Sequence, residues 1–201
     1  MILFSLSMSS DKVKSIRTGV FIDGSNLFWA MNMRDEKTGE KLHYNICFEK
    51  LRELLKFKYS PVFLNYYGVE DNNPKSEPYI TRALGNKKFH KRLDGLGYNV
   101  LRKNLKYIGE EITKGDTDME IGIDMNKYEN DYDNMVLISG DSDFLSAIQY
   151  FHSKGKHIRI YSFEKTLAWE LKEFAIKNPR CNYKLLDDLK DKLEFIPKIK
   201  T

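Results

Sequence analysis

The chain has 201 residues, of which 41% are hydrophobic and 31% charged, and its formal net charge is +4. This length suits one α/β domain with a substantial core and is short for two, and no apolar run approaches the roughly 20 residues that span a bilayer. Cys47 and Cys181 form neither a metal-ligand spacing nor a disulfide framework, so we expect a cytoplasmic protein without membrane contact.

We expect one domain over residues 16–188, between an N-terminal extension of residues 1–15 and a C-terminal tail of residues 189–201. The apolar start, Met1–Met8, is too short for a signal peptide and lacks a basic beginning. The sequence of the domain contains no internal repeat and no low-complexity segment.

Strands and helices alternate along this domain. Apolar runs that end in turn-forming residues predict strands, and apolar residues that recur at helical spacing predict helices. In chain order we predict strand Ile16–Asp23, a helix from Leu27 to Met33, a helix capped by Asn45, strand Val62–Tyr67, a helix from Pro78 to about Asp94, strand Tyr98–Leu105, an irregular stretch to Gly115, helix Thr117–Tyr128, strand Asn134–Ser139, a helix from the Asp141 turn to about Lys154, strand His157–Tyr161 and helix Thr166–Ile176.

This alternation favours the α/β class, with a central, mostly parallel sheet and helices on both faces. In such sheets ligands bind outside the carboxyl ends of the strands, near the point where the strand order reverses. Two of the predicted strands end in aspartates, because Asp23 follows Val20-Phe21-Ile22 and Asp141 follows Ile138-Ser139-Gly140. The sequence therefore predicts a functional site at this edge of the sheet.

Three aspartates are candidates for a metal site. If the strands that end in Asp23 and Asp141 are neighbours, their carboxylates lie close together and raise each other's pKa. A hard cation such as Mg²⁺ or Mn²⁺, which prefers carboxylate and water oxygens, removes that repulsion. Asp118, at the start of the helix before the Asp141 strand, is the third candidate. The alternative for each of the three is a helix cap or a turn residue.

Competing chemistries lack their residues. The sequence has no phosphate-binding loop, no dinucleotide fingerprint and no Gly-x-Ser-x-Gly elbow. Its four histidines are scattered without the paired spacing of a zinc site, so each is expected to serve in packing or at the surface; they are His43, His90, His152 and His157.

Basic residues concentrate between Arg82 and Lys106, a segment with a net charge of +7 in a chain whose remainder carries −3. Such a segment indicates a polyanionic partner, and the alternative is a solvated helix face. Phe89 and Tyr98 within it are expected in the core, whereas Tyr107 is left open as a stacking residue. The predicted nucleic-acid-binding residues are Lys87, Lys88, Lys91, Arg92, Arg102, Lys103 and Lys114. For Lys114 two interpretations stay open, an electrostatic helper near the scissile phosphate and a solvent-exposed lysine.

Taken together, these motifs resemble the NYN domain family, the LabA-like branch of the PIN-like nucleases. The Ser-Gly-Asp-Ser-Asp-Phe sequence after a strand is quite specific, and the similarity covers roughly Gly19 to Leu186. The segments that carry the resemblance are Phe21–Asn26, Lys114–Asp118 with Asp124, Leu137–Phe144, Gly155–Tyr161 and Leu167–Leu171.

The resemblance implies a PIN-like three-layer α/β/α sandwich and a Mg²⁺- or Mn²⁺-dependent endoribonuclease that acts on RNA. It implies that Asp23, Asp118 and Asp141 bind the metal, with Asp143 or Asp124 as an auxiliary ligand, and that Asn26 orients Asp23 or a metal-bound water. Two other functions stay open: a nucleic-acid-binding or regulatory module that does not cleave, and a structure-specific DNA nuclease of the same superfamily. A homodimer is also left open.

Overall fold

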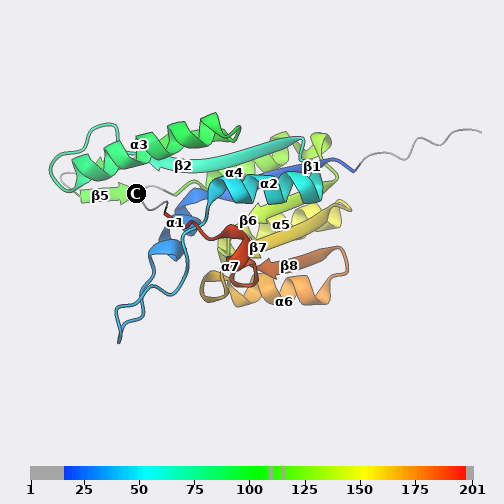
Figure 1. Cartoon of the computed structure of the whole chain (residues 1–201). Coiled ribbons are helices and arrows are strands. Elements are labelled where there is room, and N and C mark those ends of the chain that lie inside the picture. The colour runs from blue at the N-terminus through cyan, green and yellow to red at the C-terminus, as the bar shows by residue number, and fades with distance from the viewer. Residues whose placement is uncertain (1–15, 109–110, 115, 198–201) are drawn as a thin grey trace, which may run out of the picture.

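A six-stranded, all-parallel sheet forms the centre of the fold in the computed structural model (Figure 1). The structure describes residues 16–108, 111–114 and 116–197, so the predicted N-terminal extension lies outside the described residues. The strand order is β3-β2-β1-β6-β7-β8. The strands are β1 (Thr18–Asp23), β2 (Phe63–Glu70), β3 (Asn99–Asn104), β6 (Asn134–Ile138), β7 (His157–Ser162) and β8 (Cys181–Leu185).

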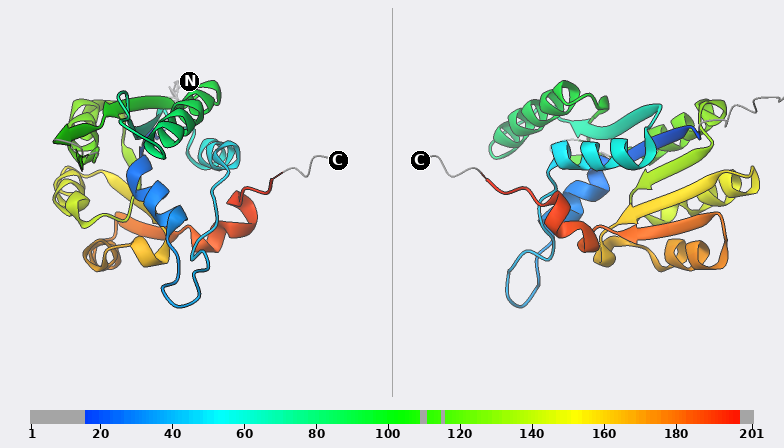
Figure 2. Two further views of the ribbon diagram at one scale, coloured as in Figure 1. Left: turned by 90° about the vertical axis from the view of Figure 1, so that its left-hand side faces the viewer. Right: turned by 45° about the vertical axis from the view of Figure 1, so that its right-hand side comes forward.

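Helices cover both faces of this sheet (Figures 1 and 2). One layer contains α1 (Gly24–Asn32), α2 (Phe48–Tyr59), α3 (Tyr79–Gly95) and α7 (Lys190–Leu193). The other contains α4 (Asp118–Lys127), α5 (Leu145–Ser153) and α6 (Trp169–Lys177). The predicted three-layer α/β/α sandwich with a parallel sheet is therefore confirmed.

The two central strands have the composition of strands that are buried on both faces. All six residues of β1 are buried, and successive side chains enter opposite layers. Val20 and Ile22 pack beneath α1 and α2, whereas Phe21 packs beneath α4 and α5. Phe21 also meets Phe63 and Tyr132 edge to face, with ring centroids 5.3 and 5.7 Å away. Because Asp23 is two residues beyond Phe21, its side chain enters the same layer as α4.

The strand order places the ends of β1 and β6 at the switch point of the sheet. From β1 the chain moves outward through β2 to β3, and on the other side it moves outward from β6 through β7 to β8. β1 and β6 pair in parallel, with Thr18 opposite Asn134 and Ile22 opposite Ile138. Their carboxyl ends are therefore the place where an open parallel sheet binds its ligands.

Three features differ from the expected pattern or extend it. The stretch before residue 115, predicted to be irregular, contains a small antiparallel pair, β4 (Lys106–Ile108) and β5 (Glu111–Lys114). The edge strand β8 was not predicted, since its Cys-Asn-Tyr-Lys-Leu sequence is only half apolar. Residues Leu189 and Leu193, in the segment expected to be a tail, are buried in the core layer that contains α2. Among the described residues no helix is long and apolar enough to cross a membrane.

Candidate active site

Asp23 is the last residue of β1 and is only 2% exposed. Its Oδ1 accepts hydrogen bonds from the backbone N–H groups of Ser25 and Asn26, both at 3.0 Å, and so caps α1. Its Oδ2 accepts a hydrogen bond from Ser139 Oγ at 3.0 Å. Burial raises the pKa of Asp23, the hydrogen bonds oppose that rise, and the charge of Asp141 adds to it.

The turn after β6 brings Asp141 toward Asp23. The backbone N–H of Asp141 donates to Ser139 Oγ at 3.2 Å, so a single serine hydroxyl bridges the two segments. The backbone N–H of Gly140 donates to Asn26 Oδ1 at 3.2 Å. Asn26 therefore ties α1 to the Asp141 turn through its side chain and orients Asp23 through its backbone.

Asp141 also caps the short 3-10 helix η2 (Ser142–Phe144), since its Oδ1 accepts a hydrogen bond from the Asp143 N–H at 3.0 Å. A carboxylate can therefore cap a helix and also belong to the acidic cluster. For Asp23 and Asp141, the helix-cap interpretation and the metal-site interpretation do not exclude each other. Only one oxygen of Asp141 is used in this cap.

Asp118 is the first residue of α4 and lies on the other side of the same edge. Burial, followed by the negative charges of four neighbouring aspartates, raises the pKa of Asp118 to about 6. Those four are Asp23, Asp141, Asp116 and Asp143. The carboxylates of Asp23, Asp118 and Asp141, which come from three segments of the chain, therefore act on one another electrostatically and form an acidic cluster at this edge.

Asp124, one of the two predicted auxiliary ligands, occupies a different environment from Asp143. It is buried, and its Oδ2 accepts a hydrogen bond from the Tyr67 hydroxyl at 2.9 Å. Tyr67 in turn accepts a hydrogen bond from Asn65 Nδ2 at 3.1 Å. The charge of Asp143 is among the largest causes of the raised pKa of Asp118, and the charge of Asp124 is not. The structure thus brings Asp143 to the cluster and engages Asp124 in a network between β2 and α4.

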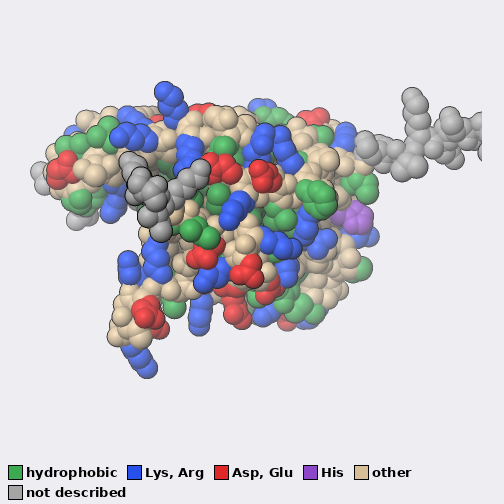
Figure 3. Space-filling view, viewed as in Figure 1, with side chains coloured by type: hydrophobic (Ala, Val, Ile, Leu, Met, Phe, Trp, Pro, Cys, Tyr) green, Lys and Arg blue, Asp and Glu red, His purple; other side chains and the backbone are tan. Residues whose placement is uncertain are grey.

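The predicted basic residues do not form one free surface. Arg92 pairs with Glu49 at 2.7 Å, Arg102 pairs with Glu70 at 3.1 Å, and Lys103 pairs with Glu120 at 2.9 Å and Asp116 at 3.8 Å. On the face that carries α2 and α7, basic and acidic side chains are interspersed (Figure 3).

The remaining predicted cations differ in their surroundings. Lys87, Lys88 and Lys91 are exposed on α3 and form no ion pair within the described part of the chain. The side chain of Lys114 lies outside the described residues. Lys103 is the predicted cation that reaches the rim of the acidic cluster, through its pair with Asp116.

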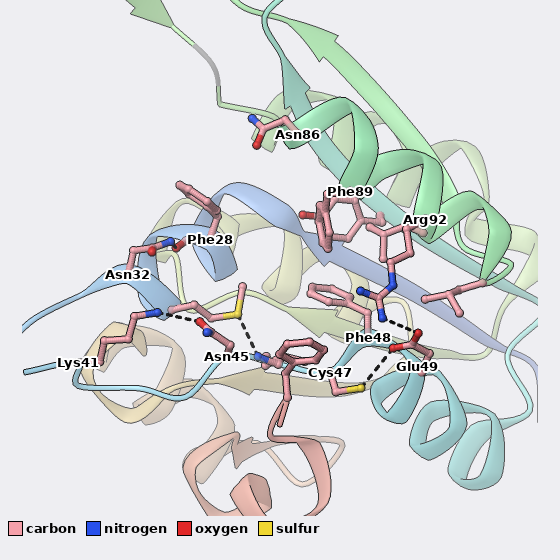
Figure 4. A pocket seen from close by; sticks show the side chains of 16 residues that line it. Phe28, Asn32, Lys41, Asn45, Cys47, Phe48, Glu49, Asn86, Phe89 and Arg92 are labelled. Carbon is pink, nitrogen blue, oxygen red and sulfur yellow. Dashed lines mark hydrogen bonds and ion pairs between the residues drawn. The ribbon is translucent and has the colours of Figure 1, made fainter. Parts of the chain in front are cut away.

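Two cavities lie on opposite sides of α1. An open cavity of about 310 Å³ borders Asp141 and is lined from α1 by Asn26 and Trp29, which share one helix face. A more apolar cavity of about 430 Å³ is lined from α1 by Phe28 and Met31, and it extends between α2 and α3 (Figure 4). None of the clustered aspartates lines this second cavity, so only the first belongs to the candidate site.

The donor chemistry of the cluster fits Mg²⁺ or Mn²⁺, because it offers carboxylate oxygens without thiolate or imidazole. Within residues 16–108, 111–114 and 116–197, no three His, Cys, Asp or Glu side chains stand in a ready-made metal-binding arrangement. A complete cage of protein ligands is not required for Mg²⁺, which usually keeps several waters and takes one or two carboxylates. The buried hydroxyl of Thr117, the residue before Asp118, has no hydrogen-bond partner in the described part of the chain.

Ser139 and Gly140 are site residues to which the sequence did not assign roles. Both lie inside the Ser-Gly-Asp-Ser-Asp-Phe motif, so the motif contained the signal. Their roles depend on the partners Asp23 and Asn26, more than a hundred residues earlier in the chain, and only the fold reveals these contacts.

The fold and the site define an α/β protein with an acidic cluster at the switch point of a parallel sheet. The chain belongs to the NYN domain family, whose profile matches residues 17–177. It is 30% identical over 184 residues to the Low amplitude and bright protein LabA of Synechococcus elongatus, and the match covers 89% of this chain and 88% of that protein. A crystal structure of a protein of unknown function from Vibrio parahaemolyticus shares the fold, with a TM-score of 0.69, 21% identity and coverage of 92% of this chain and 99% of the other.

The raised pKa of Asp118 predicts a pH-dependent penalty in the metal-free protein. Above about pH 6 the carboxylate is charged in both the folded and the unfolded chain, so folding carries the full cost of crowding it with other carboxylates. As the pH falls from 6 toward 4, the folded state takes up the proton first and this cost disappears. In EDTA, Asp118→Asn should therefore stabilise the protein at pH 7.5 by about 1 kcal/mol, after allowance for solvent screening.

Urea unfolding of both proteins at pH 7.5 and pH 4.5 measures this effect. The stabilisation by Asp118→Asn should be much smaller at the lower pH. A gain of equal size at both pH values would show that the charge of Asp118 is not its cause. Asp191→Asn serves as the control, since Asp191 is exposed on α7, away from the cluster.

The Tyr67–Asp124 contact predicts a structural role for Asp124. Tyr67→Phe removes the hydroxyl that donates to a buried carboxylate, and leaving such a group unpaired costs about 1 to 3 kcal/mol. The thermal midpoint should fall by roughly 2 to 4 °C for each kcal/mol in a domain of this size. Metal affinity at a temperature where the variant is folded should stay that of the wild type. A loss of metal affinity without loss of stability would instead place Asp124 at the metal.

Proposed function

We propose that this protein is a divalent-metal-dependent endoribonuclease that hydrolyses RNA phosphodiester bonds beside Asp23, Asp118 and Asp141. The proposal is supported by the position of Asp23, Asp118 and Asp141 at the end of β1, the start of α4 and the turn after β6, where their negative charges act on one another near the switch point of the sheet. Membership of the NYN domain family, which resembles the PIN-like nucleases, supports the same reaction class.

The side chains have different tasks in this proposal. The Asp118 carboxylate and the second oxygen of Asp141, which accept no hydrogen bond from the described part of the chain, would hold the cation. Both carboxylate oxygens of Asp23 accept hydrogen bonds, so Asp23 would hold the turn after β6 in place and add its negative charge to the cation site. Asp143 contributes charge at the rim. When bound, Mg²⁺ or Mn²⁺ lowers the pKa of a coordinated water and offsets charge on the phosphoryl oxygens.

Around the cation, the chain itself provides a rigid and accessible setting. The hydrogen bonds from Ser139 and Asn26 hold Asp23 and the Asp141 turn in a fixed relation before any substrate arrives. Lys103 lies at the rim, where its pair with Asp116 keeps a cation close to an approaching phosphate. The cavity beside Asp141 is open to solvent, so Asp141 is accessible from outside.

A cleavage assay tests the proposal. Single-stranded RNA, structured RNA and DNA are incubated with the protein in Mg²⁺, Mn²⁺, Ca²⁺ or EDTA. We expect RNA cleavage in Mg²⁺ and Mn²⁺, less in Ca²⁺ because of its looser coordination, and none in EDTA. Mn²⁺ should also raise the thermal midpoint, since a ligand that binds only the folded state stabilises it.

Each other outcome contradicts a defined part of the proposal. If RNA is cleaved equally fast in EDTA and in metal, the metal mechanism is wrong. Asp118→Asn, prepared in parallel, shows whether such cleavage comes from a contaminating nuclease. Cleavage of DNA alone favours the DNA nuclease. Binding of RNA without cleavage in either metal favours the non-cleaving module. The cytoplasmic location and a homodimer stay predictions.

A further inference from the structure

Both tryptophans of the chain are exposed, Trp29 by 60% and Trp169 by 67%. Tryptophan is usually highly buried, and a large apolar surface left in water is typical of a contact with a partner. Trp29 is on α1, which begins at Asp23, and Trp169 is the first residue of α6. Both therefore belong to segments near the carboxyl edge of the sheet.

Trp29 shares a cavity with the acidic cluster. The open cavity of about 310 Å³ is lined by Trp29 and Asn26 on one side and by Asp141 and Ser142 on another. Lys165, from the 3-10 helix η3 (Glu164–Thr166), completes its wall. An exposed indole, a cation and one of the clustered carboxylates therefore surround the same space.

A third cavity, distinct from the apolar one between α2 and α3, continues the cavity beside Asp141. It has a volume of about 430 Å³ and shares Lys165 and Leu167 with the cavity beside Asp141, and its other lining includes Trp169 and Lys172. Lys165 is exposed and forms no ion pair or hydrogen bond in the described part of the chain, although Glu164 lines the same cavity. The two adjoining cavities thus present one indole each, and the Lys165 ammonium group belongs to the wall that they share.

We infer that these two cavities form a track for unpaired RNA, in which one base stacks on Trp29, another stacks on Trp169, and Lys165 contacts the phosphate backbone between them. Stacking on aromatic side chains combined with contacts between cations and phosphates is the usual way of binding single strands without sequence preference. A duplex hides the faces of its bases, so the track selects single-stranded substrate. This inference deepens the proposed function, because it names the form of RNA that reaches Asp141.

Since the chain has only two tryptophans, its own fluorescence reports on each end of the track. Trp29→Phe leaves Trp169 as the sole indole, and Trp169→Phe leaves Trp29. The probe is an oligouridylate of about 12 nucleotides, within the range of site sizes for such grooves. In EDTA, where no metal-dependent cleavage occurs, we expect the probe to quench both single-tryptophan proteins, and a fully base-paired RNA to quench neither.

Affinity variants test the energetic part. Trp29→Ala and Trp169→Ala should each weaken oligouridylate binding by about 5- to 160-fold, which corresponds to the loss of about 1 to 3 kcal/mol for one stacked base. Lys165→Ala should weaken it and flatten its salt dependence. Phe57→Ala is the matched control, because Phe57 is 90% exposed on α2 and lines neither cavity, so affinity should not change. Thermal midpoints confirm that all variants are folded.

The results separate this inference from the proposed function. Quenching in EDTA without cleavage in Mg²⁺ or Mn²⁺ supports the track and contradicts the nuclease. Cleavage without quenching, or with unchanged affinity in both alanine variants, overturns the track alone. If charge reversal at Lys87 and Lys88 abolishes binding while the tryptophan variants bind normally, the strand follows α3 instead. If the alanine variants convert a dimer into a monomer by sedimentation and keep RNA affinity, the tryptophans form a protein interface and the inference is wrong.

Discussion

Asp141→Asn should lower the rate of RNA cleavage by two or more orders of magnitude and leave the metal-free protein at least as stable as the wild type. The amide keeps an oxygen that can accept the hydrogen bond from the Asp143 N–H, so the cap of η2 survives. What disappears is the negative charge beside Asp23 and Asp118, on which the affinity for a hard cation depends. Relief of like-charge repulsion acts in favour of the folded state.

The same result is expected for Asp23→Asn and Asp118→Asn. The amide oxygen of an asparagine at position 23 can still accept hydrogen bonds from the two backbone N–H groups at the start of α1. The variant also no longer buries a negative charge there. The measurement is the cleavage rate in Mn²⁺ beside the thermal midpoint in EDTA for each variant.

Asp191→Asn is the control for this series and should change neither quantity. Asp133→Asn is unsuitable as a control, because Asp133 forms an ion pair and backbone contact with Arg17 at the start of β1. If activity falls only in proportion to a loss of stability, the aspartates serve as caps and their assignment to the metal has to be withdrawn.

The fold was predictable because each central strand is marked in the sequence by features that lie close together. In β1 and β6 the apolar run, the strand and the following turn lie within ten residues of one another. The switch point then follows from the rules of parallel sheets. β8 was missed for the opposite reason: an edge strand is half-exposed, and in Asn182 and Lys184 it presents polar side chains that resemble a loop.

The candidate site was predictable as a set of charges but not as a set of contacts. Asp23, Asp118 and Asp141 stand at element boundaries that sequence periodicity locates, so their common position at one edge of the sheet could be expected from the sequence. Whether a charge is available depends on long-range partners. Asp124 lies on the same helix as Asp118, yet Tyr67 from β2 engages it.

The basic segment illustrates the same limit. From the local net charge, the sequence analysis assigned Arg92 and Arg102 to the binding of a polyanion. In the fold, Arg92 forms an ion pair with Glu49 and Arg102 forms one with Glu70. The exposure of Trp29 and Trp169 could not be predicted from the spacing of apolar residues, because exposure depends on how the elements pack in the fold.

Gly140→Ala should be the most disruptive single change at the site that removes no charge. A Cβ atom at residue 140 would lie 2.0 Å from the Thr166 carbonyl oxygen and 2.4 Å from Ser162 Oγ. A backbone oxygen cannot rotate away, so the turn itself has to move. We expect a cost of about 3 kcal/mol, at the upper end for overpacking, and a fall in the thermal midpoint of roughly 6 to 12 °C.

The movement should also affect the reaction, because Gly140 joins three segments of the site. Its N–H donates to Asn26 Oδ1 at 3.2 Å, and its carbonyl accepts from the Ala168 N–H at 2.9 Å. A shift of about 1 Å in the adjacent Asp141 is enough to lower cleavage about a hundredfold. Gly85→Ala in α3 is the matched control: its Cβ meets nothing within 4 Å, so it should stabilise the helix by about 0.5 to 1 kcal/mol and leave cleavage unchanged. Wild-type cleavage by Gly140→Ala at a temperature where it is folded would show that the reaction does not depend on this turn.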